Sequence, residues 1–210
     1  MDYLLNNIHV IGTGVFALLA IMNPFGNLPV FISMSDDLSR KQRARLFRHC
    51  VFVAFVIVLL FAFVGTFIMK FFFQVELSEL RIAGGLILIM MGAKNLLFPQ
   101  EVKKHDINDY NVSDDEAEQR IIPIAFPMLV GPGTLATIIV LESTSGLPLT
   151  LTMVFVTFTF IFILFMLTDY IEKLISKIAL YVLSRIMQVF IMAVGVKMME
   201  TGIRELIKWI

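Results

Sequence analysis

Residues 21–31 read IMNPFGNLPVF and place two prolines, a glycine and two asparagines inside an otherwise apolar run. Proline lacks an N–H group and clashes with the preceding helical turn, so Pro24 and Pro29 predict an interrupted helix. In hydrocarbon such an interruption is tolerated only where protein or a water-filled cavity satisfies the freed backbone groups. The stretch therefore predicts a discontinuous membrane helix whose break faces the protein interior.

The composition agrees with a membrane protein, because 58% of the 210 residues are hydrophobic and only 16% are charged. A run of about 18 or more apolar residues is long enough to cross a bilayer. Six runs meet this length, at 8–33, 47–69, 80–98, 121–141, 148–168 and 184–203. The sequence predicts an all-α membrane protein with six transmembrane helices.

The chain contains two similar halves. PFGNLP begins at Pro24 and PMLVGP begins at Pro127, 103 residues later, and the pair Arg81-Ile82 returns as Arg185-Ile186 after 104 residues. Each half holds three spans, so the second must enter the membrane from the opposite face, as in the inverted repeats of secondary transporters. We expect one transmembrane domain over residues 1–210, made of repeat 1 (1–98), a polar linker (99–120) and repeat 2 (121–210), with helices 1 and 4 discontinuous.

The basic residues predict the orientation. Segments that join spans 1–2, 3–4 and 5–6 carry eleven Lys or Arg residues, and the opposite side carries four. The positive-inside rule puts the basic side and the linker in the cytoplasm and both termini outside. SRKQRARLFRHC, residues 39–50, is read as a topology anchor rather than as a nucleic-acid or lipid-specific site.

The two breaks predict a binding site. Asn23 can cap a helix that starts at Pro24, and Gly131 precedes an equivalent start at Pro132, so both second halves direct N–H groups inward. The first halves end in carbonyls without helical partners, around Ala20, Ile21 and Met22 in one half and around Ala125 and Phe126 in the other. Backbone N–H donors for a carboxylate lie beside carbonyl acceptors for an ammonium group, and no ionised side chain is near, so the pocket suits a zwitterion. The predicted substrate-binding residues are Asn23, Pro24, Gly26, Asn27, Pro29, Pro127, Gly131, Pro132, Gly133 and Thr134.

Other readings of these residues remain open. The prolines could simply kink packed helices, Asn23 and Asn27 could join helices by hydrogen bonds, and Thr134 and Thr137 could bond back to their own helix. The span centres lack carboxylates, so a coupling ion, proton or sodium, has no assigned carrier. The sequence predicts no metal site, no cofactor, no nucleic-acid partner and no enzyme, because the spans lack paired carboxylates and metal ligands and the chain lacks a nucleotide-binding loop.

Four segments, IMNPFGNLPVFISM, ELRIAGGLILIMMG, PIAFPMLVGPGTLATIIV and SRIMQVFIMAVGVKMMETGI, resemble the MarC family of bacterial and archaeal inner-membrane proteins. The resemblance covers nearly the whole chain except the linker. It implies six spans in inverted repeats, discontinuous first and fourth helices, and, in the SnatA-like branch, transport of small neutral amino acids such as glycine and alanine. The family's broken-helix motifs fall on the ten residues named above.

The sequence therefore predicts a multi-pass protein of the cytoplasmic (inner) membrane that moves small neutral amino acids by alternating access. Its expected partners are that substrate, the lipid bilayer and a coupling ion. The alternatives are export of another small polar metabolite and a non-transporting membrane assembly protein. The oligomeric state is not predicted.

Overall fold

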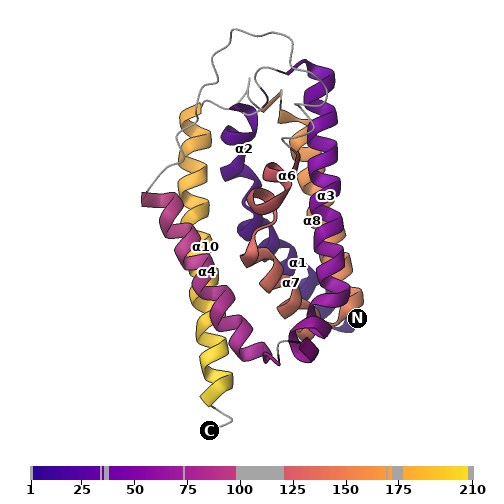
Figure 1. Cartoon of the computed structure of the whole chain (residues 1–210), viewed down its shortest axis with the longest axis vertical. Coiled ribbons are helices and arrows are strands. Elements are labelled where there is room, and N and C mark those ends of the chain that lie inside the picture. Colours follow the sequence, from indigo (N-terminus) through magenta and orange to yellow (C-terminus); the bar gives the residue numbers. More distant parts are fainter. Residues whose placement is uncertain are drawn as a thin grey trace.

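Figure 1 shows a computed structural model of the chain, which describes residues 2–33, 35, 38–72, 74–97, 121–168, 170–171 and 177–207. The predicted linker, 99–120, lies outside these residues. Every regular element within them is a helix, as predicted for an all-α protein. The elements are α1 (Asp2–Met22), α2 (Pro24–Ser33), α3 (Arg40–Phe67), the π-helix η1 (Ile68–Phe72), α4 (Leu77–Leu97), α6 (Ile121–Pro123), the π-helix η2 (Ile124–Leu129), α7 (Pro132–Ser145), α8 (Leu147–Met166) and α10 (Lys177–Ile207).

Five helical segments in the described residues are long and apolar enough to cross a membrane: Asn7–Leu28, Arg40–Phe72, Leu77–Leu97, Leu147–Met166 and Arg185–Ile207. They overlap five of the six predicted spans. The predicted span 121–141 does not form one long helix, because η2 and residues 130–131 separate α6 from α7. The 14 residues of α7 measure about 21 Å at 1.5 Å per residue, less than the roughly 30 Å of the hydrocarbon core.

The basic stretch is helical and forms the first turns of α3, seven residues before the predicted start of span 2. Ser39 caps this helix: its hydroxyl accepts from the Gln42 N–H at 3.4 Å, and its own N–H donates to Gln42 Oε1 at 3.1 Å. Such a capping box satisfies two N–H groups that the helix start leaves without partners. The predicted span was defined by a run of apolar residues, so it did not include these polar first turns of the helix.

The helices form two outer pairs with the broken elements between them (Figure 1). One pair is α4 and α10, the other is α3 and α8, and α1–α2 and α6–α7 run in opposite directions between the pairs. In the α4–α10 pair the backbones are in contact, since a Cβ on Gly85 would lie 2.5 Å from the Gly195 carbonyl oxygen. The glycines of α4 therefore permit close helix packing.

An aromatic cluster joins the upper ends of α2, α3 and α8. The ring of Phe31 lies 4.6 Å from that of Phe165 and 6.3 Å from that of Phe47, and the Phe47 and Phe165 rings are 5.5 Å apart. Because these three side chains are almost completely buried, they fix α2 against the α3–α8 pair. The end of the first broken element is thereby held in place.

Candidate functional site

The first break is a single residue wide. α1 ends at Met22 and α2 begins at Pro24, and Asn23 between them has a φ of 44°, a left-handed conformation that asparagine tolerates better than most residues. The Asn23 side chain is buried, and its Oδ1 accepts from the Gly26 N–H at 3.0 Å. Asn23 therefore caps α2 with Pro24 at the first helical position, as the sequence indicates.

The Met22 carbonyl at this break accepts a hydrogen bond from a side chain. Asn27 Nδ2 donates to the Met22 carbonyl at 3.1 Å, and the backbone continues across the break, since Asn23 N–H donates to the Leu19 carbonyl and Asn27 N–H to the Asn23 carbonyl. The donor to the Met22 carbonyl is thus an amide side chain and not a helical N–H group. The second lone pair of this carbonyl can still accept.

The second break is wider. Phe126, inside η2, has an extended backbone with φ −143° and ψ 129°, and the N–H of Val130 donates to the Ala125 carbonyl at 3.0 Å. The Ala125 carbonyl, also expected to lack a helical partner, is thus partnered by a π-type bond from five residues later. α7 then starts at Pro132 after an extended Gly131, as the sequence predicts.

The two breaks keep the register of the sequence repeat. Asn23 and Phe126 are non-helical residues, and each directly precedes the first proline of the matched motif in its half, PFGNLP or PMLVGP. They are 103 residues apart, which is the spacing of Pro24 and Pro127. Proline disfavours the helical conformation of the residue before it, so the same local rule acts at the same place in both halves.

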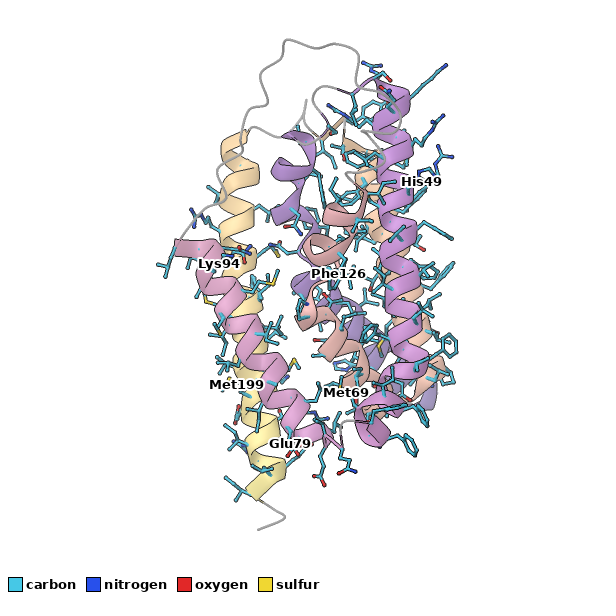
Figure 2. The ribbon with its side chains drawn as sticks, viewed as in Figure 1. His49, Met69, Glu79, Lys94, Phe126 and Met199 are labelled. Atoms are coloured by element: carbon cyan, nitrogen blue, oxygen red, sulfur yellow. The ribbon has the colours of Figure 1, made fainter. Side chains whose placement is uncertain are left out.

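The breaks approach each other in the centre of the molecule. A Cβ on Gly133 would overlap the Leu88 side chain of α4 and would lie 3.9 Å from Ile21 Cγ2, next to the first break. Ile21, Leu88 and Ile191 form a small buried cluster that joins α1, α4 and α10. Figure 2 places Phe126 between the two outer helix pairs. Segments from both halves therefore line one central region.

The start of α7 differs from the start of α2 because no side chain caps it. Gly131, Gly133 and Thr134 are buried there, and Thr134 is only 2% exposed. The Thr134 hydroxyl makes no hydrogen bond to any described residue, whereas the Thr137 hydroxyl donates back to the Gly133 carbonyl at 2.8 Å. The first-turn N–H groups of a helix without a cap form an anion-binding position.

The other predicted site residues are distributed around these starts. Pro24 is buried, Gly26 and Asn27 are half-buried, and Pro132 is exposed. Pro29 lies within α2 and Pro127 within η2; their side chains are outside the described part of the chain. The structure thus brings Asn23, Gly26 and Asn27 together at the first break and Gly131, Gly133 and Thr134 at the second.

Gln188 of α10 is a polar residue that the sequence reasoning did not identify. Its side chain is 4% exposed, and within the described residues its Oε1 has no hydrogen-bond partner. It precedes Ile191 by one turn, and α10 packs against α2 as well as α4. The available signal was a single amide in the apolar run RIMQVFIMAVG. The sequence alone does not show that α10 lies beside the first broken element, so this amide could not be assigned to the site.

Charged side chains in the described ranges pair near the helix ends. Arg81, buried at the start of α4, forms an ion pair with Glu205 of α10, and Arg185 Nη1 donates to the Asn95 and Leu96 carbonyls at the end of α4. Glu200 pairs with Arg204 at 2.6 Å, and Glu142 accepts from the Thr66 hydroxyl. No group of three or more His, Cys, Asp or Glu residues in these ranges is arranged to hold a metal ion.

Comparison with known proteins identifies the family. The model of the MarC family integral membrane proteins matches residues 8–207. The chain is 29% identical over 214 residues to the UPF0056 inner membrane protein MarC of Escherichia coli, with 94% of this chain and 96% of the relative covered. It is 27% identical over 194 residues to the UPF0056 membrane protein YvbG of Bacillus subtilis, with coverages of 90% and 91%.

A membrane protein of the same type from Methanocaldococcus jannaschii is 28% identical over 192 residues, which are 90% of this chain and 93% of the relative. No solved structure matches the chain. The family match extends through both broken elements and all five long helical segments. The chain therefore belongs to the MarC family of integral membrane proteins.

Proposed function

We propose that this protein is a secondary transporter of small neutral amino acids such as glycine and alanine, and not an enzyme. One observation carries the proposal: two backbone breaks in sequence register approach each other in the centre of a helical membrane protein. In transporters built from inverted repeats, substrate sites lie at such discontinuous helices. The proposal includes six spans, with α6, η2 and α7 together forming the fourth.

The packing of the helices supports an inverted repeat. α2 packs against α10 and α7 packs against α4, so the second part of each broken element lies against the last long helix of the other half. Figure 1 shows the two broken elements running in opposite directions. A twofold axis in the membrane plane would generate this exchange, and alternating access would then move the halves around the central site.

The proposed substrate class follows from the hydrogen-bonding groups at the two helix breaks. The substrate's carboxylate would bind the first-turn N–H groups of α7, beside Gly133 and the Thr134 hydroxyl. Its ammonium group would donate to Gln188 Oε1 and to the remaining lone pair of the Met22 carbonyl. Because Leu88 and Ile21 cover this region closely, a glycine- or alanine-sized side chain fits best. The coupling ion, proton or sodium, would be identified by experiment.

The decisive experiment is uptake of labelled glycine and alanine by purified protein in liposomes, with proton and sodium gradients imposed separately. Saturable uptake is expected for the wild type and should be lost in Asn23→Ala, which removes the cap of α2. Asn95→Ala, outside the site, is the matched control. Absence of uptake under every gradient, from folded protein, would contradict the proposal.

Gly131→Leu tests the second break. A leucine at this buried position would fill the space at the start of α7, so substrate binding should be lost. Gly12→Leu is the control. Gly12 lies in α1, the first part of the other broken element, and no atom lies within 4 Å of a Cβ at this position. Equal binding by both variants would rule out the assigned site.

A further inference from the structure

A groove lies on the outer surface of the protein between α3 and α8, away from the central breaks. It encloses about 260 Å³. The edge-to-face contact between Phe55 and Phe158, with ring centroids 5.3 Å apart, forms its floor, while Phe52 and Phe155 are 63% and 65% exposed at its edges. The apolar lining comes from Val51, Phe52 and Phe55 of α3 and from Phe155, Phe158 and Phe162 of α8.

One end of the groove carries a cation. Arg48 lines it one helical turn before Phe52, is exposed, and makes no ion pair or hydrogen bond with any described residue. The other polar lining residue, Thr159, donates its hydroxyl to the Phe155 carbonyl at 2.8 Å. The groove therefore combines an apolar channel with a guanidinium group at one end.

The sequence of α3 extends this arrangement along one helix face. Lys41, Arg45, Arg48, Phe52 and Phe55 follow one another at intervals of four, three, four and three residues, which places them on the same stripe of a helix. Cations thus lie at the end of the stripe near the start of α3, and aromatic rings lie deeper. A phospholipid in one leaflet has a matching order, with its charged headgroup at the membrane surface and its acyl chains deeper.

We propose that this groove binds one acyl chain of an anionic phospholipid whose phosphate pairs with Arg48. This gives one residue of the stretch 39–50, interpreted from the sequence as a topology anchor only, a lipid-specific role as well. A guanidinium group matches a phosphate through two parallel N–H donors, and anionic lipids of the cytoplasmic leaflet attract basic residues next to a membrane helix. The groove volume accommodates part of one chain, and the rest of the lipid lies in the bilayer. Because α3 and α8 belong to different halves of the chain, this lipid contacts both.

The test measures lipid selection at the groove by tryptophan quenching. In a Trp209→Phe background, Phe155→Trp places a reporter in the groove, and Leu97→Trp places one on a 70% exposed position at the end of α4. Figure 2 shows Lys94, near the same end of α4, in the upper half of the molecule with His49. Each variant is reconstituted in mixtures of phosphatidylcholine and phosphatidylglycerol, of which one carries brominated chains. Phe162→Trp replaces the reporter if Phe155→Trp does not fold.

The groove reporter should prefer phosphatidylglycerol by about fivefold, the effect of one basic residue at an anionic surface. Arg48→Gln should abolish this preference, Arg48→Lys should retain part of it, and the Leu97→Trp reporter should show little. An equal preference at both reporters would mean general charge attraction and would overturn the proposal. Protection of the groove reporter from both lipids would also overturn it, because a second copy or another protein would then cover the groove.

Discussion

Asn23 and Asn27 stabilise the first break because their side chains replace missing backbone hydrogen-bond partners. Asn23 Oδ1 receives the Gly26 N–H, and Asn27 Nδ2 reaches back to the Met22 carbonyl. These two side chains satisfy one donor and one acceptor that the interrupted helix would leave without partners. The break therefore exists without a large loss of stability.

Gly26→Ala should disrupt this arrangement. A Cβ at Gly26 would overlap the Nδ2, Cγ and Oδ1 atoms of Asn23, so the cap must leave its position at a cost of about 1 kcal/mol. The melting temperature in detergent should fall by about 2–4 °C. Gly12→Ala, with open space around the new Cβ, should leave it unchanged or slightly higher. Equal melting temperatures for the two variants would contradict the capping role.

Gln188→Met should separate stability from binding. The substitution keeps the side-chain size and removes a buried Oε1 that has no partner among the described residues, so the melting temperature should stay the same or rise by about 2–4 °C. Binding of alanine, measured by calorimetry, should fall at least tenfold. A lower melting temperature together with intact binding would show that Gln188 has a structural role only.

At the scale of elements, the sequence predicted helix starts better than helix breaks. The start of α2 at Pro24 and the start of α7 at Pro132 follow from local rules for asparagine, glycine and proline. The six-residue η2 was not predicted, because its bond from Val130 to Ala125 depends on the burial of Ala125 and Val130 against other helices. Gln188 was missed for the same reason, since its burial depends on a helix from the other end of the chain.

The α4–α10 pair gives a prediction at this scale. In Gly85→Ala the new Cβ would lie 2.5 Å from the Gly195 carbonyl oxygen and 2.9 Å from the Met199 nitrogen. Backbone atoms cannot rotate away as a side chain can, so the helices must separate, at a cost of about 1–3 kcal/mol. Thermal unfolding should occur at a lower temperature, while Ala83→Leu, on the exposed face of the same helix, should have little effect. Comparable losses in both variants would contradict this packing.

At the scale of the whole molecule, charge is distributed unequally between the two ends. α3 begins with Arg40, Lys41, Arg43, Arg45 and Arg48, and the opposite end of the molecule carries Glu79 (Figure 2) and the Glu200–Arg204 and Arg81–Glu205 pairs. α1 begins and α10 ends at this second end (Figure 1). The positive-inside rule predicts that the start of α3 faces the cytoplasm.

Cysteine labelling checks this orientation. In a Cys50→Ala background, which removes the single cysteine of the chain, new cysteines replace Lys41 and Lys70, two exposed residues at opposite ends of the α3–η1 segment. In intact bacteria a membrane-impermeant maleimide should label Lys70→Cys, and it should label Lys41→Cys only after the membrane is permeabilised. The reverse pattern would invert the predicted topology.

The unequal widths of the two breaks have a mechanical consequence. Backbone rotation at Asn23 must disturb the Asn23–Gly26 and Asn27–Met22 hydrogen bonds, whereas the start of α7 has no side-chain cap to lose. Bending at the start of α7 would therefore break fewer side-chain hydrogen bonds than bending at Asn23. In the alternating access proposed above, two breaks that differ in this way would not move as mirror images of each other.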